Sequence, residues 1–284
     1  MTAHWQELNI PRALPSLFLK AAMRRRVQGT QLPEQGLRCW ISLNPEQLAA
    51  YRQVCGFADD GLLPATYPHV LAFPLLMQLL TAGDFPFPLL GLIHLSNTIR
   101  VLRPMGNVSS VRVGVQVGNL QPHAKGATFD LVTLVDDLLG PLWEAESRLL
   151  CRAVKLPGEP PSQPLPPGEN LSETSRWRAE SDIGRRYARV SGDYNPIHLS
   201  AWSARLFGFP QAIAHGLWNK ARTLAALSEQ LPAANIEVAV QFIKPVLLPS
   251  EVRLLASTAG SSGALQLLGS GELQHMQGCW QPIA

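Results

Sequence analysis

A proline-rich segment near the middle of the chain sets the strongest limit on how the chain can fold. Residues 155–168 read KLPGEPPSQPLPPG, in which six of the fourteen residues are proline and two are glycine. Because proline lacks a backbone N–H and fixes its backbone angle, this segment forms neither a helix nor a central strand. It favours an extended, solvated linker. We therefore predict an N-terminal domain over residues 1–154, a linker over 155–172 and a C-terminal domain over 173–284.

The composition fits globular domains with substantial cores. Apolar residues make up 46% of the 284 residues and charged residues 16%, which excludes a disordered chain. No apolar run reaches the ~18 residues that a membrane span needs. The net charge of +3 is only mildly basic and does not indicate a nucleic-acid-binding protein. The short run Arg24-Arg25-Arg26 is interpreted as a solvated face, with contact to an anionic ligand as the alternative.

The two sides of the linker have the same order of sequence patterns. Each has an apolar helix pattern, a strand pattern, a basic residue followed by proline, and then another strand pattern. Arg103-Pro104 and Lys244-Pro245 are offset by 141 positions, as are Val111-Arg112 and Val252-Arg253. A long strand-rich stretch after one helix predicts, in each half, an α+β fold with an antiparallel sheet around a central helix.

Helix ends are indicated by capping residues. Residues 70–80 are apolar on nearly all sides and predict a buried helix, with Pro74 in its first turn. In the second half, an apolar stripe with Lys220 and Arg222 off it predicts the matching helix. Three further helices have an expected N-cap and a glycine stop, and these pairs are Asn44 with Gly56, Ser181 with Gly192, and Ser200 with Gly208.

The segment DYNPIH, residues 193–198, places an acid and a histidine between two of these helices. In a helix, residues five apart would point about 140° away from each other. Gly192 ends the preceding helix, however, and Pro196 pushes Asn195 out of the helical region. We therefore predict a turn, braced by the Asn195 side chain, that brings Asp193 and His198 to one water for acid–base chemistry.

The segment IAHGLW places His215 and Gly216 at the start of the second central helix. The free N–H groups and positive dipole end of a helix start can hold a developing oxyanion. Because Gly216 has no side chain, a carbonyl group can approach its backbone closely. Each residue also has a structural explanation: Asp193 as a turn brace, His198 as a core residue and Gly216 as a close-packing residue. Their combination within 30 residues favours a site.

This stretch resembles the hydratase-2 motif of the MaoC-like dehydratases, the R-specific enoyl-CoA hydratases. The resemblance covers residues 187–218, YARVSGDYNPIHLSAWSARLFGFPQAIAHGLW, and nearly every motif position is kept. It implies a hot-dog fold in each half, and hence a double hot-dog. It also implies that Asp193 and His198 form the catalytic pair and that Gly216 supplies the oxyanion N–H. We assign substrate-binding roles to Asn195 and His215, and we expect no metal and no cofactor.

The N-terminal half resembles the substrate-side hot dog of two-copy members. It lacks a counterpart of residues 193–198, and Phe73-Pro74 stands where the second half has His-Gly. We therefore predict that this half is non-catalytic and that His69 and His94 are structural. Five basic residues are candidates for contact with coenzyme A phosphates, with a solvated face as the alternative: Arg100, Arg103, Lys220, Arg222 and Lys244.

The resemblance implies the reversible hydration of a trans-2-enoyl thioester to an (R)-3-hydroxyacyl thioester, carried by coenzyme A or by an acyl carrier protein. A hot-dog thioesterase, a non-catalytic acyl-thioester binding protein and a structural subunit of a larger complex are the alternatives. The four scattered cysteines and the absence of a secretory pattern at the N-terminus indicate a cytoplasmic enzyme, with organelle targeting left open. Two copies in one chain allow a monomer or a homodimer.

Overall fold

The computed structural model describes residues 4–106, 108–161, 165, 168, 170–258 and 260–283. The chain divides into two compact units. The first contains Met1–Leu43, Leu71–Asn97 and Val108–Pro164, and the second contains Asn44–Val70, Thr98–Asn107 and Leu165–Ala284. Two segments of the N-terminal half thus belong to the second unit. Within the described ranges, no helix is long and apolar enough to cross a membrane.

The predicted linker falls partly outside the described residues, which omit 162–164, 166, 167 and 169. The described residues from 155 to 161 form neither helix nor strand, as the proline content predicts. The proposed domain boundaries at 154 and 173 stay a prediction.

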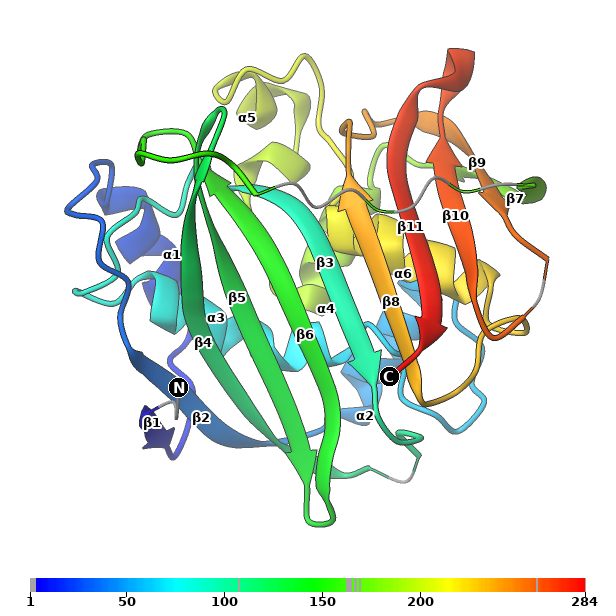
Figure 1. The fold of residues 1–284 in the computed structure, drawn as a ribbon, viewed down its shortest axis with the longest axis horizontal. Helices are drawn as coiled ribbons and strands as arrows, with labels where there is room; N and C mark the ends of the chain where they lie inside the picture. Colours follow the sequence, from blue (N-terminus) through cyan, green and yellow to red (C-terminus); the bar gives the residue numbers. More distant parts are fainter. Residues whose placement is uncertain are drawn as a thin grey trace. The chain divides into compact units, whose positions relative to one another are not determined.

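The first unit is built on a sheet of long strands. Their order is β1-β2-β4-β5-β6-β3, with β2, β4, β5 and β6 paired antiparallel and β1 parallel to β2 (Figure 1). Residues 93–97 of β3 belong to this unit, and the remainder of β3 belongs to the second. The bounds are β1 His4–Leu8, β2 Gln35–Ser42, β3 Ile93–Val101, β4 Ser110–His123, β5 Gly126–Asp137 and β6 Gly140–Cys151.

Two helices accompany this sheet, α1 (Leu14–Met23) and α3 (Pro68–Leu80). The predicted helix over 70–80 is confirmed, but it begins two residues earlier, because Pro68 has the backbone angle that a first helical residue requires. Pro74 therefore lies inside the helix and not in its first turn. After α3, the buried side chains of Phe85, Phe87 and Phe129 form an aromatic cluster in the core of this unit, with ring centroids 5.6–5.7 Å apart.

The second unit repeats the same strand order. Its strands run β8-β11-β10-β9-β7, which matches β3-β6-β5-β4-β2 of the first unit strand for strand. The helix α6 (Gly216–Ala226) lies across one face of these strands (Figure 1). This confirms the prediction of two copies of one α+β fold. The bounds are β7 Ser172–Ala179, β8 Ile236–Phe242, β9 Ser250–Ala256, β10 Gly263–Leu268 and β11 Gln274–Pro282.

Shorter helices surround α6 in the second unit. They are α2 (Pro45–Cys55), α4 (Ile183–Ser191), the 3₁₀ turn η1 (Pro196–His198), α5 (Ala201–Arg205) and the 3₁₀ turn η2 (Ser270–Glu272). The predicted caps Asn44 and Ser200 are confirmed, since each side chain accepts backbone N–H groups of the first turn. Ser181 was predicted as the N-cap of α4, but Asp182 occupies that position.

The helix α2 packs on α4 and α6, although it precedes them in sequence by more than a hundred residues. The side-chain amide of Gln47 donates to the carbonyl of Val190 at 2.9 Å, and the indole N–H of Trp218 donates to the carbonyl of Val54 at 3.1 Å. Each bond satisfies a carbonyl in the last turn of a helix, Val190 in α4 and Val54 in α2. The helix α2 thus helps to fix the position of α4, which ends where the predicted turn begins.

Candidate active site

The turn after α4 is built as the sequence predicts. Gly192 ends the helix in the left-handed region at φ 80°, a conformation that glycine adopts without a steric penalty. The carboxyl of Asp193 accepts the N–H of Asn195 at 3.1 Å, and the side chain of Asn195 accepts the N–H of Ile197 at 3.4 Å. These bonds satisfy backbone N–H groups that have no acceptor within a helix. Both Asp193 and Asn195 therefore brace the turn. The second carboxyl oxygen of Asp193 takes no part in this bracing.

His198 is tied to the segment that leads into α6. Its Nδ1 lies 2.7 Å from the carbonyl oxygen of Ile213, and the N–H of Ile213 donates to the carbonyl of Ile197 at 3.1 Å. Because a carbonyl oxygen can only accept, Nδ1 carries the hydrogen in the neutral ring and Nε2 presents a lone pair. The residue is 8% exposed and therefore buried.

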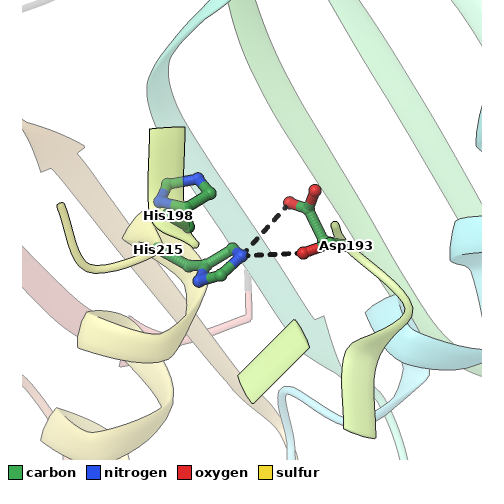
Figure 2. Close-up of side chains that lie close together, drawn as sticks. All are labelled: Asp193, His198 and His215. Atoms are coloured by element: carbon green, nitrogen blue, oxygen red, sulfur yellow. Dashed lines mark hydrogen bonds and ion pairs between the residues drawn. The ribbon is translucent and has the colours of Figure 1, made fainter. Parts of the chain in front are cut away.

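His215 completes the cluster from the other side. It is the N-cap of α6, and its ring stacks on the ring of His198 with centroids 3.6 Å apart and planes 25° apart. Figure 2 shows its Nε2 facing Asp193, at 3.0 Å from the backbone carbonyl and 3.9 Å from the carboxyl. The predicted turn thus brings Asp193 and His198 together, and His215 holds the two ends of the turn in place.

These three side chains form the one group among the described residues with metal-ligand character. One donor atom from each lies within 4.8 Å of the other two. The ring nitrogens His198 Nδ1 and His215 Nε2, however, already face backbone carbonyls. Two stacked rings also hold their lone pairs in nearly parallel planes, which is unfavourable for a shared tetrahedral ion. The arrangement is better suited to hydrogen bonding than to metal ligation.

Burial controls the charges in the cluster. Desolvation, reinforced by the neighbouring His215, lowers the pKa of His198 to about 3. Desolvation lowers the pKa of His215 to about 4. It raises the pKa of Asp193 above its ordinary value, although His198 opposes that shift. At neutral pH both imidazoles are therefore uncharged, and the Asp193 carboxyl, with a side chain 32% exposed, is the most accessible of the three groups.

An aromatic wall supplies part of this burial. The ring of Tyr187, on α4, lies with its centroid 4.9 Å from that of His215. Tyr51, on α2, lies 6.1 Å behind Tyr187 and donates its hydroxyl to Thr66 at 2.7 Å. The sequence analysis gave neither tyrosine a place beside the histidines. Their part could not be seen in the sequence, because Tyr51 reaches the site only through the packing of α2 on α4.

Gly216 begins α6, so its N–H belongs to the first turn, which has no acceptor within the helix. A side chain at this position would place its Cβ 3.1–3.3 Å from the ring of Phe242. The close approach at Gly216 is therefore to an aromatic ring of β8, which supports the close-packing explanation. It leaves the N–H of Gly216 as a candidate donor for an oxyanion.

A second glycine, Gly184 on α4, was missed by sequence reasoning. A Cβ at Gly184 would lie 2.0 Å from the carbonyl oxygen of His198, so that turn and helix touch backbone to backbone. Glycine inside a helix lowers helix stability by about 1 kcal/mol relative to alanine. A glycine within a predicted helix therefore indicates that another group packs closely against it.

The basic candidates have different surroundings. Lys220 is fully buried and donates to the carbonyl of Val238 at 2.9 Å, so both earlier interpretations of it, as a phosphate contact or as part of a solvated face, are wrong. The α6 helix is enclosed on more sides than its apolar stripe suggested. Arg222 packs over the ring of Trp177, and Arg100 pairs with Glu237 at 2.7 Å. His69 is buried within α3, and the structural role predicted for it stays a prediction, as does that of His94.

Comparison with known proteins identifies relatives over most of the chain. A family model described as "MaoC like domain" matches residues 162–268. The 3-hydroxyacyl-thioester dehydratase X of Mycobacterium tuberculosis is 37% identical over 228 residues, which cover 80% of this chain and 81% of that protein. A crystal structure of HtdX from the same organism superposes with a TM-score of 0.76 at 32% identity, covering 87% of this chain and 100% of that one.

A more distant structure shows the same fold. The MaoC-like dehydratase from Phytophthora capsici superposes with a TM-score of 0.75 at 19% identity, over 90% of this chain and 97% of that chain. The predicted double hot-dog fold is therefore confirmed by structures that span both copies.

The neutral histidines make stability depend on pH. In the unfolded chain a histidine binds a proton below about pH 6.5, whereas in the folded protein His215 and His198 stay neutral down to about 4 and about 3. The unfolded state therefore binds more protons in this window, and stability falls as pH falls from about 6.5 to 4. We expect a loss of about 1 kcal/mol per pH unit for each histidine.

Urea unfolding between pH 4.5 and 7.5 measures this slope. The variant His198→Gln/His215→Gln should lose most of it, whereas the matched control His4→Gln/His123→Gln, on the first unit, should keep it. An unfolding free energy of the parent that stays constant between pH 6.5 and 4.5 would contradict the assigned charges.

Gly184→Ala tests how α4 positions the turn. The new Cβ has no room beside the His198 carbonyl, so the turn must move. We expect a loss of about 1–3 kcal/mol in the free energy of unfolding and a larger fractional loss of activity than of folded protein. Gly118→Ala, where the new Cβ has open space and the backbone is not left-handed, is the control for adding a methyl group without a clash. Full activity of Gly184→Ala would show that the contact does not fix the turn.

Proposed function

The chain belongs to the MaoC-like dehydratase family, and we propose that Asp193 and His198 carry its reaction on acyl thioesters. The predicted reaction class, the reversible hydration and dehydration of acyl thioesters by a hydro-lyase, is confirmed by the names of its relatives. The finer proposal is that a trans-2-enoyl thioester gains water to become an (R)-3-hydroxyacyl thioester. The observation that carries it is the close cluster of Asp193, His198 and His215.

The pair is suited to hold one water between a carboxylate and a lone pair. Nε2 of His198 is an acceptor, because Nδ1 donates to Ile213. The Asp193 carboxyl is the second acceptor, and its raised pKa makes it the better proton carrier of the two. We therefore assign orientation of the water to His198 and uptake of its proton to Asp193.

The electron flow balances without a further reactant. As the water oxygen bonds to the β-carbon, the electrons of the double bond move toward the thioester carbonyl, whose oxygen gains negative charge. The proton taken up from the water then returns to the α-carbon. The dehydration direction runs through the same steps in reverse.

The N–H of Gly216 is the proposed donor to the enolate oxygen. It lies at the positive end of the α6 dipole and directly follows His215 in the chain. Loss of one such donor costs about 10²–10³ in rate. The Asn195 and His215 side chains both hydrogen-bond to the backbone of the turn. These bonds support a role in holding the turn in place. The substrate-binding roles predicted for both residues stay predictions.

Several finer features remain part of the proposal. The thioester carrier is coenzyme A or an acyl carrier protein. The N-terminal copy is proposed to be non-catalytic, since it has no counterpart of the 193–198 turn and no His-Gly at its central helix. We propose a cytoplasmic enzyme, and a homodimer remains the alternative to a monomer.

Two other functions on the same fold are distinguished by one assay. A thioesterase would direct the water at the carbonyl carbon and release a free thiol. An acyl-thioester binding protein would need neither the neutral histidine nor the accessible acid. The turn that places both groups together favours the hydratase over these alternatives.

The test uses crotonyl-CoA. Hydration removes the absorbance of the conjugated enoyl thioester without releasing thiol. We expect Asp193→Asn and His198→Gln each to lower kcat by about 10²–10⁴, because the first removes the group that takes up the proton of the water and the second removes the imidazole lone pair that orients the water. Binding of crotonyl-CoA and the urea unfolding midpoint should change little.

Asp84→Asn and His4→Gln, two exposed positions of the first unit, are the matched controls and should retain parental activity. Release of thiol by the parent would indicate a thioesterase. Parental rates in the Asp193→Asn/His198→Gln double variant would remove the pair from the mechanism.

A further inference from the structure

A basic surface lies on the first unit at the end of α1. Lys20, Met23, Arg24, Arg25 and Arg26 line a cavity of ≈ 510 Å³, together with residues of the turn that follows α3. All five, with Leu19, are referred to below as the α1 surface. No acidic residue is among those that line the cavity. The nearest acid in the adjoining recess is Asp84, which is exposed.

The positive charge is fixed in place at the centre of this surface. The guanidinium of Arg24 donates to the carbonyls of Phe85 and of Ala82, the latter at 2.7 Å, so the turn after α3 anchors it. Lys20 lies in the last turn of α1, and Arg24 is the residue that ends this helix. Arg25 and Arg26 follow directly and are exposed. An anionic partner would meet four neighbouring cations, of which Arg24 is already held in place.

Exposed apolar side chains accompany the cations. Leu19 and Met23 are 63% and 67% exposed, and their spacing of four residues places them one above the other on α1. Methionine and arginine are enriched at protein interfaces, which combine an apolar centre with a charged rim.

We propose that the α1 surface is the docking site for an acidic acyl carrier protein that delivers the thioester. This inference rests on the proposed function and names its partner. Coenzyme A fits the surface less well, because no aromatic ring lines the cavity on which adenine could stack. The exposed apolar pair of Leu19 and Met23 also has no counterpart in a nucleotide.

Charge reversal at two exposed positions tests the proposal. The variant Arg25→Glu/Arg26→Glu is assayed with crotonyl-CoA and with the crotonyl thioester of a bacterial acyl carrier protein. We expect KM for the carrier-bound substrate to rise about tenfold, with kcat and all constants for crotonyl-CoA unchanged. KM of the parent for the carrier-bound substrate should rise with salt, because exposed charges are screened.

Two further variants separate the contribution of these cations from that of net charge and of the apolar pair. Lys125→Glu/Lys155→Glu, at exposed positions elsewhere on the first unit, makes the same change in net charge and should leave both substrates unaffected. Leu19→Ser/Met23→Ser should also raise KM for the carrier-bound substrate, but without changing its salt dependence.

Other results would overturn the proposal. A rise in KM for crotonyl-CoA alone would indicate a site for coenzyme A phosphates. An equal rise for both substrates would indicate a general change in the enzyme, and no rise for either would indicate a solvated face. Loss of binding to anionic phospholipid vesicles, with KM unaltered for the carrier-bound substrate, would indicate a membrane surface. Fluorescence anisotropy of labelled carrier protein measures docking without turnover. An inactive parent would contradict the proposed function. The anisotropy result would still decide whether the carrier protein docks on the α1 surface.

Discussion

The hydrogen bond from His198 to the carbonyl of Ile213 is the interaction on which the site depends. It joins the turn after α4 to the segment that opens α6, and the reciprocal backbone bond from Ile213 to Ile197 makes the connection two-sided. Because that bond uses Nδ1, it also fixes Nε2 as the nitrogen of the neutral ring that keeps its lone pair. Without it, the turn would still form, but its acid and imidazole would have no fixed relation to the start of α6.

The two copies of the fold show what this connection adds. Their strands follow the same order, although the first copy has no counterpart of residues 193–198. In the second copy the segment between α4 and α5 holds the proposed pair of Asp193 and His198, and Gly184 lets this segment approach α4 closely. Helix α2 of the N-terminal half belongs to the second unit and adds Tyr51 to the aromatic wall beside the histidines. The strand order of the fold therefore does not require the turn that holds the proposed pair.

Local features of the site were predictable from sequence, because they depend on residues close together in the chain. Gly192 and Pro196 dictate a turn, and the Asn195 brace follows from its own backbone. The stacking of His215 on His198 was not predictable, since the two residues lie seventeen positions apart and their segments are joined by hydrogen bonds that the sequence does not reveal. The burial of Lys220 was also missed, because an apolar stripe indicates one buried face and α6 is enclosed more completely.

The protonation of His198 is the most direct test of this account. Nitrogen-15 NMR of histidine-labelled protein, with His198→Gln used to assign the signal, distinguishes the two neutral tautomers and the imidazolium. We predict that the His198 ring is neutral at pH 7, with the hydrogen on Nδ1 and a lone pair on Nε2. A ring that is protonated on both nitrogens at pH 7, or that carries its hydrogen on Nε2, would contradict it.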